Sequence, residues 1–245
     1  MQSNFVTKSG LPVKKIIEFD PIRQTIAERM TGSLHDTAQL TLMSEIIVDG
    51  LIEAKDRFSK EYNYKFTYTE ILAKIIGKLL EKEENQYLNA VLEDNKIKII
   101  SPVNLGIAVS TNYGLVVPVV KDITSKSLLQ ISENLRELSD KAREMQLTLD
   151  DIEGGTFTLT NLGMFGIDSF TPIINPPQTG ILGVGRIVKK PTYDELTSSI
   201  KISNTSWMSL TFDHRILDGA MASIFLKELS EVLLSYEEIK SFISF

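Results

Sequence analysis

The sequence predicts a mixed α/β domain in which a sheet is flanked by helices, and two patterns indicate this fold class. Several longer segments place apolar residues at steps of three and four, which is typical of amphipathic helices. Between them lie short runs in which apolar and polar residues alternate, which is typical of half-buried strands. A chain of 245 residues is long enough to bury a full core. With no internal repeat or low-complexity tract, we expect one domain over residues 14–245 after a flexible segment at 1–13.

The first part of this domain contains two helices and a strand. Asp20 is a suitable cap and Pro21 a suitable first residue for a helix over "DPIRQTIAERM". The run "QLTLMSEIIV" alternates with a period of two and predicts a strand. In "TYTEILAKIIGKLLEKEEN", Thr67 and Glu70 have the spacing of a capping box, and the apolar residues that follow have helical spacing.

The middle of the chain predicts short strands and a long helix. The runs "IKII", "LGIAVS" and "LVVPVV" are separated by Pro, Gly and Asn, so we expect strands joined by tight turns. Pro118 cannot donate a ladder hydrogen bond, which favours a sheet edge there. The stretch "KSLLQISENLRELSDKAREM" has the apolar stripe of a helix that packs on the sheet.

The last part predicts two more strands and a closing helix. In "GGTFTLTNLG", Phe157 and Leu159 point to one face, while a row of threonines that ends at Thr160 points to the other. The run "SWMSLTFDH" alternates as a strand, and "DGAMASIFLKELSEVLLSYEEI" has helical spacing as far as Tyr236.

Composition excludes several classes of function. The net charge of −6 is interspersed, which makes a nucleic-acid surface a poor expectation. Apolar runs are too short to span a membrane and no signal peptide is evident, so we expect a soluble, cytoplasmic protein. Without cysteine there is no disulfide, thiolate zinc site or cysteine nucleophile, and any thiol chemistry must use a substrate thiol. The motifs of P-loops, serine hydrolases, zinc peptidases and dinucleotide-binding folds are missing, and we expect no metal.

His214 is the candidate catalytic residue, and it is one of only two histidines. It follows Met208, Leu210 and Phe212 on one face of the predicted strand. A core histidine whose ring nitrogens are satisfied by the backbone is one interpretation. Alternatively, an apolar setting keeps the ring neutral, so that it can act as a general base. His35 lies in a polar connection, and we expect it to be structural.

Asp218 also has two interpretations. An aspartate directly before "GAMASIF" is typical of a helix N-cap. A turn between His214 and Asp218 could also bring the carboxylate back under the imidazole, and the two roles can coexist.

At this point four stretches resemble one family, the catalytic domain of the dihydrolipoamide acyltransferase component of 2-oxo acid dehydrogenase complexes. "DHRILDGA" (residues 213–220) is similar to the family's D-H-R-x-x-D-G signature. "FTLTNLGMFGIDSFTPIINPPQTGILGVG" (residues 157–185) resembles its central block, and "IRQTIAERM" and "NLGIAVSTNYGLVVPVV" resemble two further segments. These stretches follow the family's order over about nine tenths of the chain, which a single motif would not do.

The resemblance implies a fold similar to chloramphenicol acetyltransferase. It also implies trimers with active sites between subunits, and the assembly of these trimers into a hollow cubic or icosahedral core. It implies acyl transfer between a dihydrolipoyl thiol and coenzyme A, with His214 as the catalytic base. By the same resemblance, Thr160 stabilises the tetrahedral oxyanion from across the subunit boundary, and Asp218 matches the acidic signature position. By analogy with chloramphenicol acetyltransferase, Arg23 could pair with Asp218. Residues that bind coenzyme A are not assigned.

The resemblance further implies a lipoyl domain and the decarboxylase and dihydrolipoamide dehydrogenase components as partners. The lipoyl group would be carried on a domain that this chain does not contain, since no lipoyl-lysine hairpin or small helical domain precedes Pro21. The sequence has Ala38-Gln39 where the family often has Pro-His. It does not indicate whether the acyl group is acetyl, succinyl or branched-chain.

Two alternative functions remain open. A stand-alone acetyltransferase would use the same histidine on an alcohol, although its signature usually begins His-His and Asp213 stands there in this chain. A non-catalytic scaffold would keep the fold and assembly without turnover, but His214 and Thr160 are both present.

Overall fold

The centre of the molecule is a seven-stranded mixed sheet. Six of its strands have the order β1-β11-β9-β8-β4-β7, and the seventh, β10, pairs with β11. A computed structural model describes residues 6–194 and 197–243. Strands β4, β8 and β9 are parallel neighbours, and the other pairs are antiparallel. Their bounds are β1 (Gln39–Ile47), β4 (Leu105–Ile107), β7 (Val119–Val120), β8 (Phe157–Asn161), β9 (Gly180–Val184), β10 (Val188–Asp194) and β11 (Ser199–Asp213). The predicted fold class, a mixed sheet flanked by helices, is confirmed.

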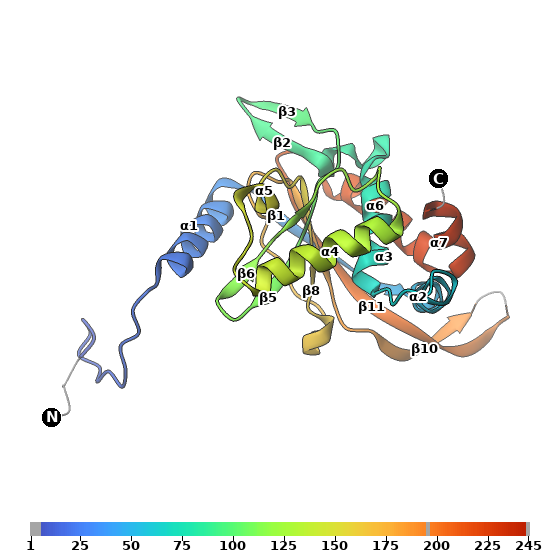
Figure 1. Ribbon diagram of the computed structural model, residues 1–245, viewed down its shortest axis with the longest axis horizontal. Helices are drawn as coiled ribbons and strands as arrows, with labels where there is room; N and C mark the ends of the chain where they lie inside the picture. The colour runs from blue at the N-terminus through green and yellow to red at the C-terminus, as the bar shows by residue number, and fades with distance from the viewer. Residues whose placement is uncertain (1–5, 195–196, 244–245) are drawn as a thin grey trace.

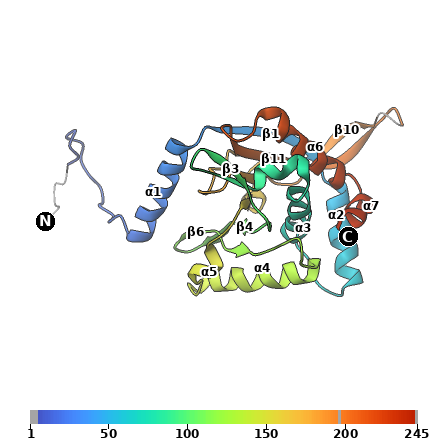
Figure 2. The same ribbon diagram turned by 90° about the horizontal axis from the view of Figure 1, so that it is seen from above.

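Helices pack around this sheet, and small hairpins lie at its margins (Figure 1). The helices are α1 (Pro21–Asp36), α2 (Asp49–Glu61), α3 (Tyr68–Leu80), α4 (Leu128–Arg143), α5 (Leu149–Ile152), α6 (Gly219–Leu233) and α7 (Tyr236–Ile243), with 3-10 turns η1 (Glu83–Asn89) and η2 (Gly163–Phe165). The hairpins pair β2 (Ala90–Glu93) with β3 (Lys96–Ile99), and β5 (Val109–Thr111) with β6 (Gly114–Val116). Figures 1 and 2 both show α1 and the segment before it extending away from the rest of the chain.

The predicted helix starts are confirmed by their caps. The Asp20 carboxylate accepts from the Arg23 amide, with Pro21 directly after the cap. Thr67 and Glu70 form a complete capping box at α3. The predicted edge is also confirmed, because Pro118 directly precedes β7, the last strand of the sheet order.

Two local expectations are wrong, and one helix was not predicted. The helix α1 continues to Asp36, so His35 lies in its last turn and not in a polar connection. The buried Ser33 hydroxyl donates to the Ile174 carbonyl, a tertiary contact that holds this polar turn helical. The closing helix is two helices, because the Ser235 hydroxyl accepts from the Glu238 amide and starts α7. The helix that was not predicted from the sequence is α2, whose first turn has no side-chain cap.

The two faces of the sheet have different chemistry. Leu159, Leu182 and Leu210 lie on the face that forms the main core with the helices. The opposite face contains serines and threonines, as the alternation predicts for β8, and this polar row is also buried. Its hydroxyls bond within the chain: Thr158 donates to the Gln178 side chain, and the Thr41 and Thr211 hydroxyls are 2.8 Å apart. Small polar residues on this face therefore let a long loop, residues 162–178, pack against the sheet.

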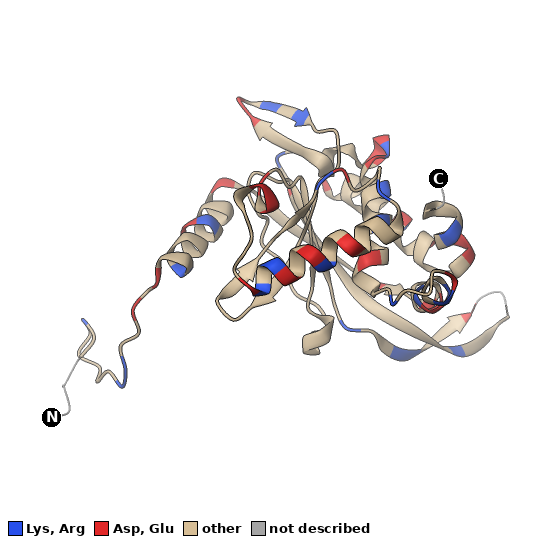
Figure 3. Ribbon diagram, in the orientation of Figure 1, with Lys and Arg blue, Asp and Glu red and all other residues tan. Residues whose placement is uncertain are grey.

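Charged residues of both signs are interspersed along the helices, most clearly on α4 (Figure 3). The described ion pairs include several within one helix, such as Lys141 with Glu137. None of the described helices has the length and apolar character needed to cross a membrane.

A pair of glycine substitutions should test how closely α2 approaches the chain before α7. A Cβ at Gly50 would lie 2.5 Å from backbone atoms of Ser235, so Gly50→Ala should lower the free energy of unfolding by about 1–3 kcal/mol. A Cβ at Gly32, inside α1, meets nothing within 4 Å, so Gly32→Ala should leave stability unchanged or raise it by up to about 1 kcal/mol. Urea unfolding midpoints measure both changes, and equal effects of the two variants would contradict this packing.

Candidate active site

His214 follows directly after β11, where the buried apolar row of that strand ends. Met208, Leu210 and Phe212 are almost completely buried, and the His214 ring lies 6.0 Å from the Phe212 ring at a tilt of 33°. The imidazole itself is exposed, and no hydrogen bond to it comes from the described residues. The interpretation as a core histidine satisfied by the backbone is therefore wrong. The apolar row is as predicted, but a single chain does not make the sheltered setting.

The residues on either side of His214 form an ion pair between a buried carboxylate and a half-exposed guanidinium. The Arg215 guanidinium donates to both Asp213 carboxylate oxygens, with Nη2 to Oδ2 at 2.6 Å and Nε at 3.0 Å from each oxygen. Asp213 is 2% exposed. Burial raises the pKa of the Asp213 carboxyl, but the hydrogen bonds from Arg215 and from the Arg215 and Ala38 amides outweigh burial, and the net pKa is lowered. The same pair raises the pKa of Arg215.

The main chain of His214 is fixed against the start of β1. Its amide donates to the Ala38 carbonyl at 2.8 Å, and the Ala38 amide donates to the Asp213 carboxylate at 3.2 Å. The next residue, Gln39, donates to the Ser33 and Thr37 hydroxyls and accepts from the Ile174 amide. The Ala38-Gln39 pair therefore connects the end of α1, the loop 162–178 and the turn that carries His214.

Sequence reasoning did not select Asp213 and Arg215 as site residues. A usable signal was present, because Asp213 ends a strand in which the two preceding residues on the same face are Thr211 and Ser209. A charge at a buried strand position requires a partner, and Arg215 is the cation closest in sequence.

Asp218 is the N-cap of α6, as one of its two interpretations predicts. Its Oδ1 accepts from the Met221 amide at 2.9 Å. The predicted Arg23–Asp218 pair is not formed within one chain: the Arg23 guanidinium lies 3.9 Å from Asp20, and both side chains are largely exposed. No described interaction joins Asp218 to the His214 ring.

Thr160 differs from the other threonines of its row. The Thr156 hydroxyl donates to the Asn104 carbonyl, and the Thr158 hydroxyl donates to Gln178. Thr160 is 7% exposed, yet its hydroxyl has no hydrogen-bond partner among the described residues. Among the described residues of this polar face, the fully enclosed unpaired hydroxyl belongs to Ser209, whereas the Thr160 hydroxyl keeps some access to solvent and is therefore open to a group from outside the chain.

Strand register separates Thr160 from His214 of the same chain. Thr160 is opposite Gly183 in β9, and Gly183 is opposite Ser209 in β11. His214 lies five residues beyond Ser209, which at about 3.3 Å per residue corresponds to roughly 17 Å along the strand. Two strand spacings add about 10 Å across the sheet. One chain therefore cannot place both side chains on the same substrate atom.

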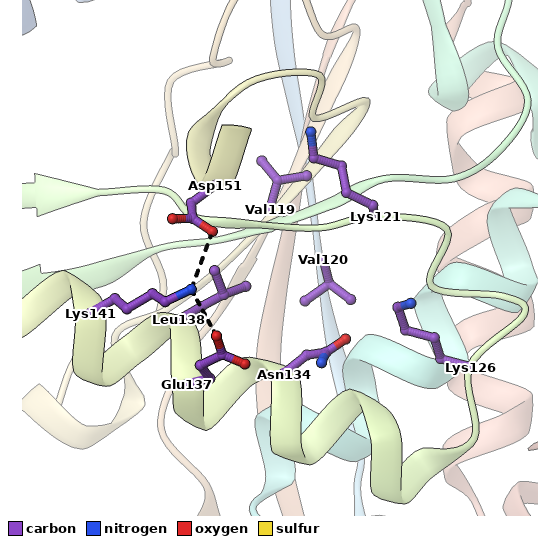
Figure 4. A pocket seen from close by; sticks show the side chains of 9 residues that line it. All are labelled: Val119, Val120, Lys121, Lys126, Asn134, Glu137, Leu138, Lys141 and Asp151. Atoms are coloured by element: carbon purple, nitrogen blue, oxygen red, sulfur yellow. Dashed lines mark ion pairs between the residues drawn. The ribbon is translucent and has the colours of Figure 1, made fainter. Parts of the chain in front are cut away.

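None of the predicted site residues lines either of two pockets found among the described residues. The pocket of Figure 4, about 210 Å³, lies between α4, α5 and β7. Lys141 points between Glu137 and Asp151 there, and the hydrogen bond that it donates to Glu137 is the main cause of its raised pKa. The described residues also contain no cluster of His, Asp and Glu suited to a metal ion.

Comparison with known proteins gives the family. The sequence model of the 2-oxoacid dehydrogenases acyltransferase (catalytic domain) matches residues 12–240. The chain belongs to this family. It is 37% identical over 218 residues to the dihydrolipoyllysine-residue acetyltransferase component of the acetoin cleaving system of Bacillus subtilis, covering 86% of this chain and 53% of that protein. The succinyltransferase component of the mitochondrial 2-oxoglutarate dehydrogenase complex of Bos taurus is 35% identical over 226 residues, 90% of this chain and 49% of the relative.

Solved structures of the family have the same fold. The dihydrolipoamide acetyltransferase of Azotobacter vinelandii, solved to investigate a serine, a histidine and an asparagine in its catalytic mechanism, has a TM-score of 0.86 and 30% identity, covering 95% of both chains. The cubic core of the pyruvate dehydrogenase multienzyme complex also has a TM-score of 0.86, at 29% identity and the same coverage. The chain spans about half the length of the curated relatives it matches.

The stability of the protein should depend on the ionisation of Asp213. The folded state holds the pKa of this carboxyl below its ordinary value of 3.8, so the stabilisation is complete above that value and is lost as pH falls through the lowered pKa. Asp213→Asn should lower the free energy of unfolding by about 1.5–3 kcal/mol at pH 7, the range for hydrogen bonds to charged groups. The difference in free energy of unfolding between Asp213→Asn and the wild type should become smaller below about pH 4.

Urea unfolding followed through Trp207, the single tryptophan, measures this difference at each pH. A difference that stays constant or grows as the pH falls would contradict the assigned ionisation of Asp213.

Proposed function

We propose that this chain catalyses acyl transfer between a dihydrolipoyl thiol and coenzyme A, with each active site formed by His214 of one subunit and Thr160 of another. The observation that supports this most strongly is the unpartnered Thr160 hydroxyl, held by the strand register far from its own chain's exposed His214. Family membership supports the reaction, since relatives are named as dihydrolipoyllysine-residue acetyl- and succinyltransferases.

The chemistry requires a base and an oxyanion donor. A thiol with a pKa of about 8.5, taking cysteine as its model, is only a few per cent ionised near pH 7. A neutral His214 ring takes the proton from the coenzyme A thiol, and the thiolate attacks the carbonyl carbon of the acyl-lipoyl thioester. The Thr160 hydroxyl donates to the oxyanion of the tetrahedral intermediate. When the carbon–sulfur bond to the lipoyl group breaks, the His214 imidazolium returns the proton to the departing sulfur.

Assembly is part of the same proposal. The site is incomplete without a second copy, and closed rings of like subunits supply such a contact at every interface. We propose trimers that build a larger core, for which the similarity to a cubic core gives support. The lipoyl domain, the decarboxylase and the dihydrolipoamide dehydrogenase components are proposed partners, and the cytoplasm the proposed location.

Acceptor specificity should test the reaction directly. With an acyl-coenzyme A donor, we expect transfer to dihydrolipoamide and at least about tenfold slower transfer to alcohol acceptors, because a thiol ionises far more readily than an alcohol. Particle size is measured in the same samples. Faster transfer to an alcohol would favour the stand-alone acetyltransferase, and inert large particles would favour the scaffold.

Single substitutions should separate the roles of His214 and Thr160. His214→Ala should lower kcat by about 10²–10⁴, the usual contribution of a general base. Thr160→Ala should lower kcat by about 10²–10³ through loss of one oxyanion donor, while Thr160→Ser should keep most activity. The quantity measured is the steady-state rate of acyl transfer, at unchanged particle size. A rate of acyl transfer near the wild-type value in either alanine variant would contradict the proposed mechanism.

A mixed-subunit experiment should show that the site spans two chains. Consider an assembly made from equal amounts of His214→Ala and Thr160→Ala subunits. At each interface the chance of an intact His214 on one side is one half, and so is the chance of an intact Thr160 on the other. About one quarter of the interfaces therefore combine both intact residues. Transfer activity should therefore recover to about a quarter of the wild-type value, although each parent variant is nearly inactive. Co-expression with two affinity tags gives the mixed particle. Activity no higher than in the parents would show that both residues act within one chain.

A further inference from the structure

The turn that carries His214 is held by one residue on both its main chain and its side chain. The Asp213 carbonyl accepts from the Ile216 amide at 3.0 Å, and the Asp213 carboxylate accepts from the Arg215 amide at 3.1 Å. A carboxylate that accepts from the amide two residues on closes an Asx turn, with His214 as its middle residue. The main chain on both sides of the imidazole is therefore fixed through one buried carboxylate.

The charges around His214 come from three elements. Asp213 ends β11, Arg215 follows in the turn, and Asp218 caps α6. From α1, the charge of Asp36 acts on Arg215, and Asp36 is itself paired with His35. Asp213 and Arg215 cancel each other next to the ring. The guanidinium uses Nε and Nη2 for this pair, and its side chain is 45% exposed.

We propose that Asp213 and Arg215 are positioning residues that set both the orientation and the charge balance of His214 for acyl transfer. This inference rests on the proposed function of His214. Neither residue has to touch the substrate, because both act on the turn: the carboxylate fixes the backbone, and the guanidinium keeps that carboxylate ionised and in place.

Removing either member of the pair should have opposite electrostatic consequences. Asp213→Asn leaves the Arg215 cation unbalanced beside the imidazole, which disfavours the protonated ring. Arg215→Ala leaves the Asp213 carboxylate unbalanced, which favours the protonated ring. If the two residues only stabilised the fold, the two substitutions would not shift the protonation equilibrium of the His214 ring in opposite directions.

The first experiment compares steady-state kinetics in the assembled particle. Asp213→Asn and Arg215→Ala should lower kcat by about 10- to 100-fold, the cost of a misplaced catalytic group, with KM for coenzyme A within about twofold. Arg215→Lys should lower kcat less than Arg215→Ala does, since an ammonium keeps the positive charge although it cannot form the two-pronged hydrogen bonds of the guanidinium. Free guanidinium should raise the kcat of Arg215→Ala at least about threefold by refilling the exposed half of the pair.

A matched control lies on α6, remote from the turn. Glu228 is 19% exposed, pairs with Lys82 at 2.5 Å and accepts from Asn85 at 2.6 Å. Glu228→Gln makes the same acid-to-amide change in a comparable ion pair. It should lower stability to a similar degree, keep kcat within about twofold and show no response to guanidinium.

The second experiment does not depend on catalysis. Diethyl pyrocarbonate modifies unprotonated imidazoles, and His35, which is 87% exposed, is the only other histidine and serves as the internal reference. Between about pH 5 and 8, the pH midpoint for modification of His214 should move down in Asp213→Asn and up in Arg215→Ala. The midpoint for His35, which is reached only through its partner Asp36, should move much less than that of His214 in either variant.

These readouts separate two kinds of failure. If His214→Ala keeps its activity while the midpoints shift as expected, the proposed function fails and the assignment of the ion pair stands. If His214→Ala is inactive but Arg215→Lys and Asp213→Asn keep wild-type kcat and wild-type midpoints, the positioning role is overturned. A loss of kcat that only follows the folded fraction, as measured for Glu228→Gln, overturns it as well.

Discussion

The register between β8, β9 and β11 is the constraint on which the rest of the site depends. It places Thr160 level with Ser209, and so puts His214 near the opposite end of the same sheet. Because side chains alternate with a period of two, a slip of one residue would turn the threonine row into the core and Leu159 out of it. The buried leucines of the three strands prevent that slip, and the same packing that stabilises the domain fixes the separation of its two reactive groups.

A single subunit has the groups for acyl transfer but not the environment. The exposed His214 ring is open to water, which competes for its hydrogen bonds and weakens any electrostatic stabilisation of a transition state. The Thr160 hydroxyl is in the reverse situation, since it is almost buried and still unpaired. In the proposed assembly, contact between two copies would meet both needs, because it would shelter the imidazole of one copy and bring the Thr160 hydroxyl of the other copy to it. The absence of cysteine is consistent with this arrangement, because both thiols of the proposed reaction belong to substrates.

Local patterns predicted the elements better than their ends and connections. The capping box at Thr67 and the alternation around Thr160 depend on neighbouring residues, and both were predictable from sequence. The continuation of α1 to Asp36 depends on Ser33 bonding to Ile174, a contact 141 residues away that no local pattern contains. The exposure of His214 was missed for a different reason. A strand pattern assigns a face to a side chain, but not what lies beyond the end of the sheet.

The turn that carries His214 is supported within one chain by a local ion pair and not by a distant one. The expected Arg23–Asp218 contact would join the first turn of α1 to the start of α6, and it is not formed within one chain, where Arg23 lies 3.9 Å from Asp20. Asp213 and Arg215 are two residues apart, so their pairing orders almost no additional chain. The contribution of α1 is confined to its last turn, where Ser33 and Gln39 anchor it beside Ala38. Within one chain the first turns of α1 make no described contact with Asp218, which is consistent with their position away from the body of the chain in both views (Figures 1 and 2).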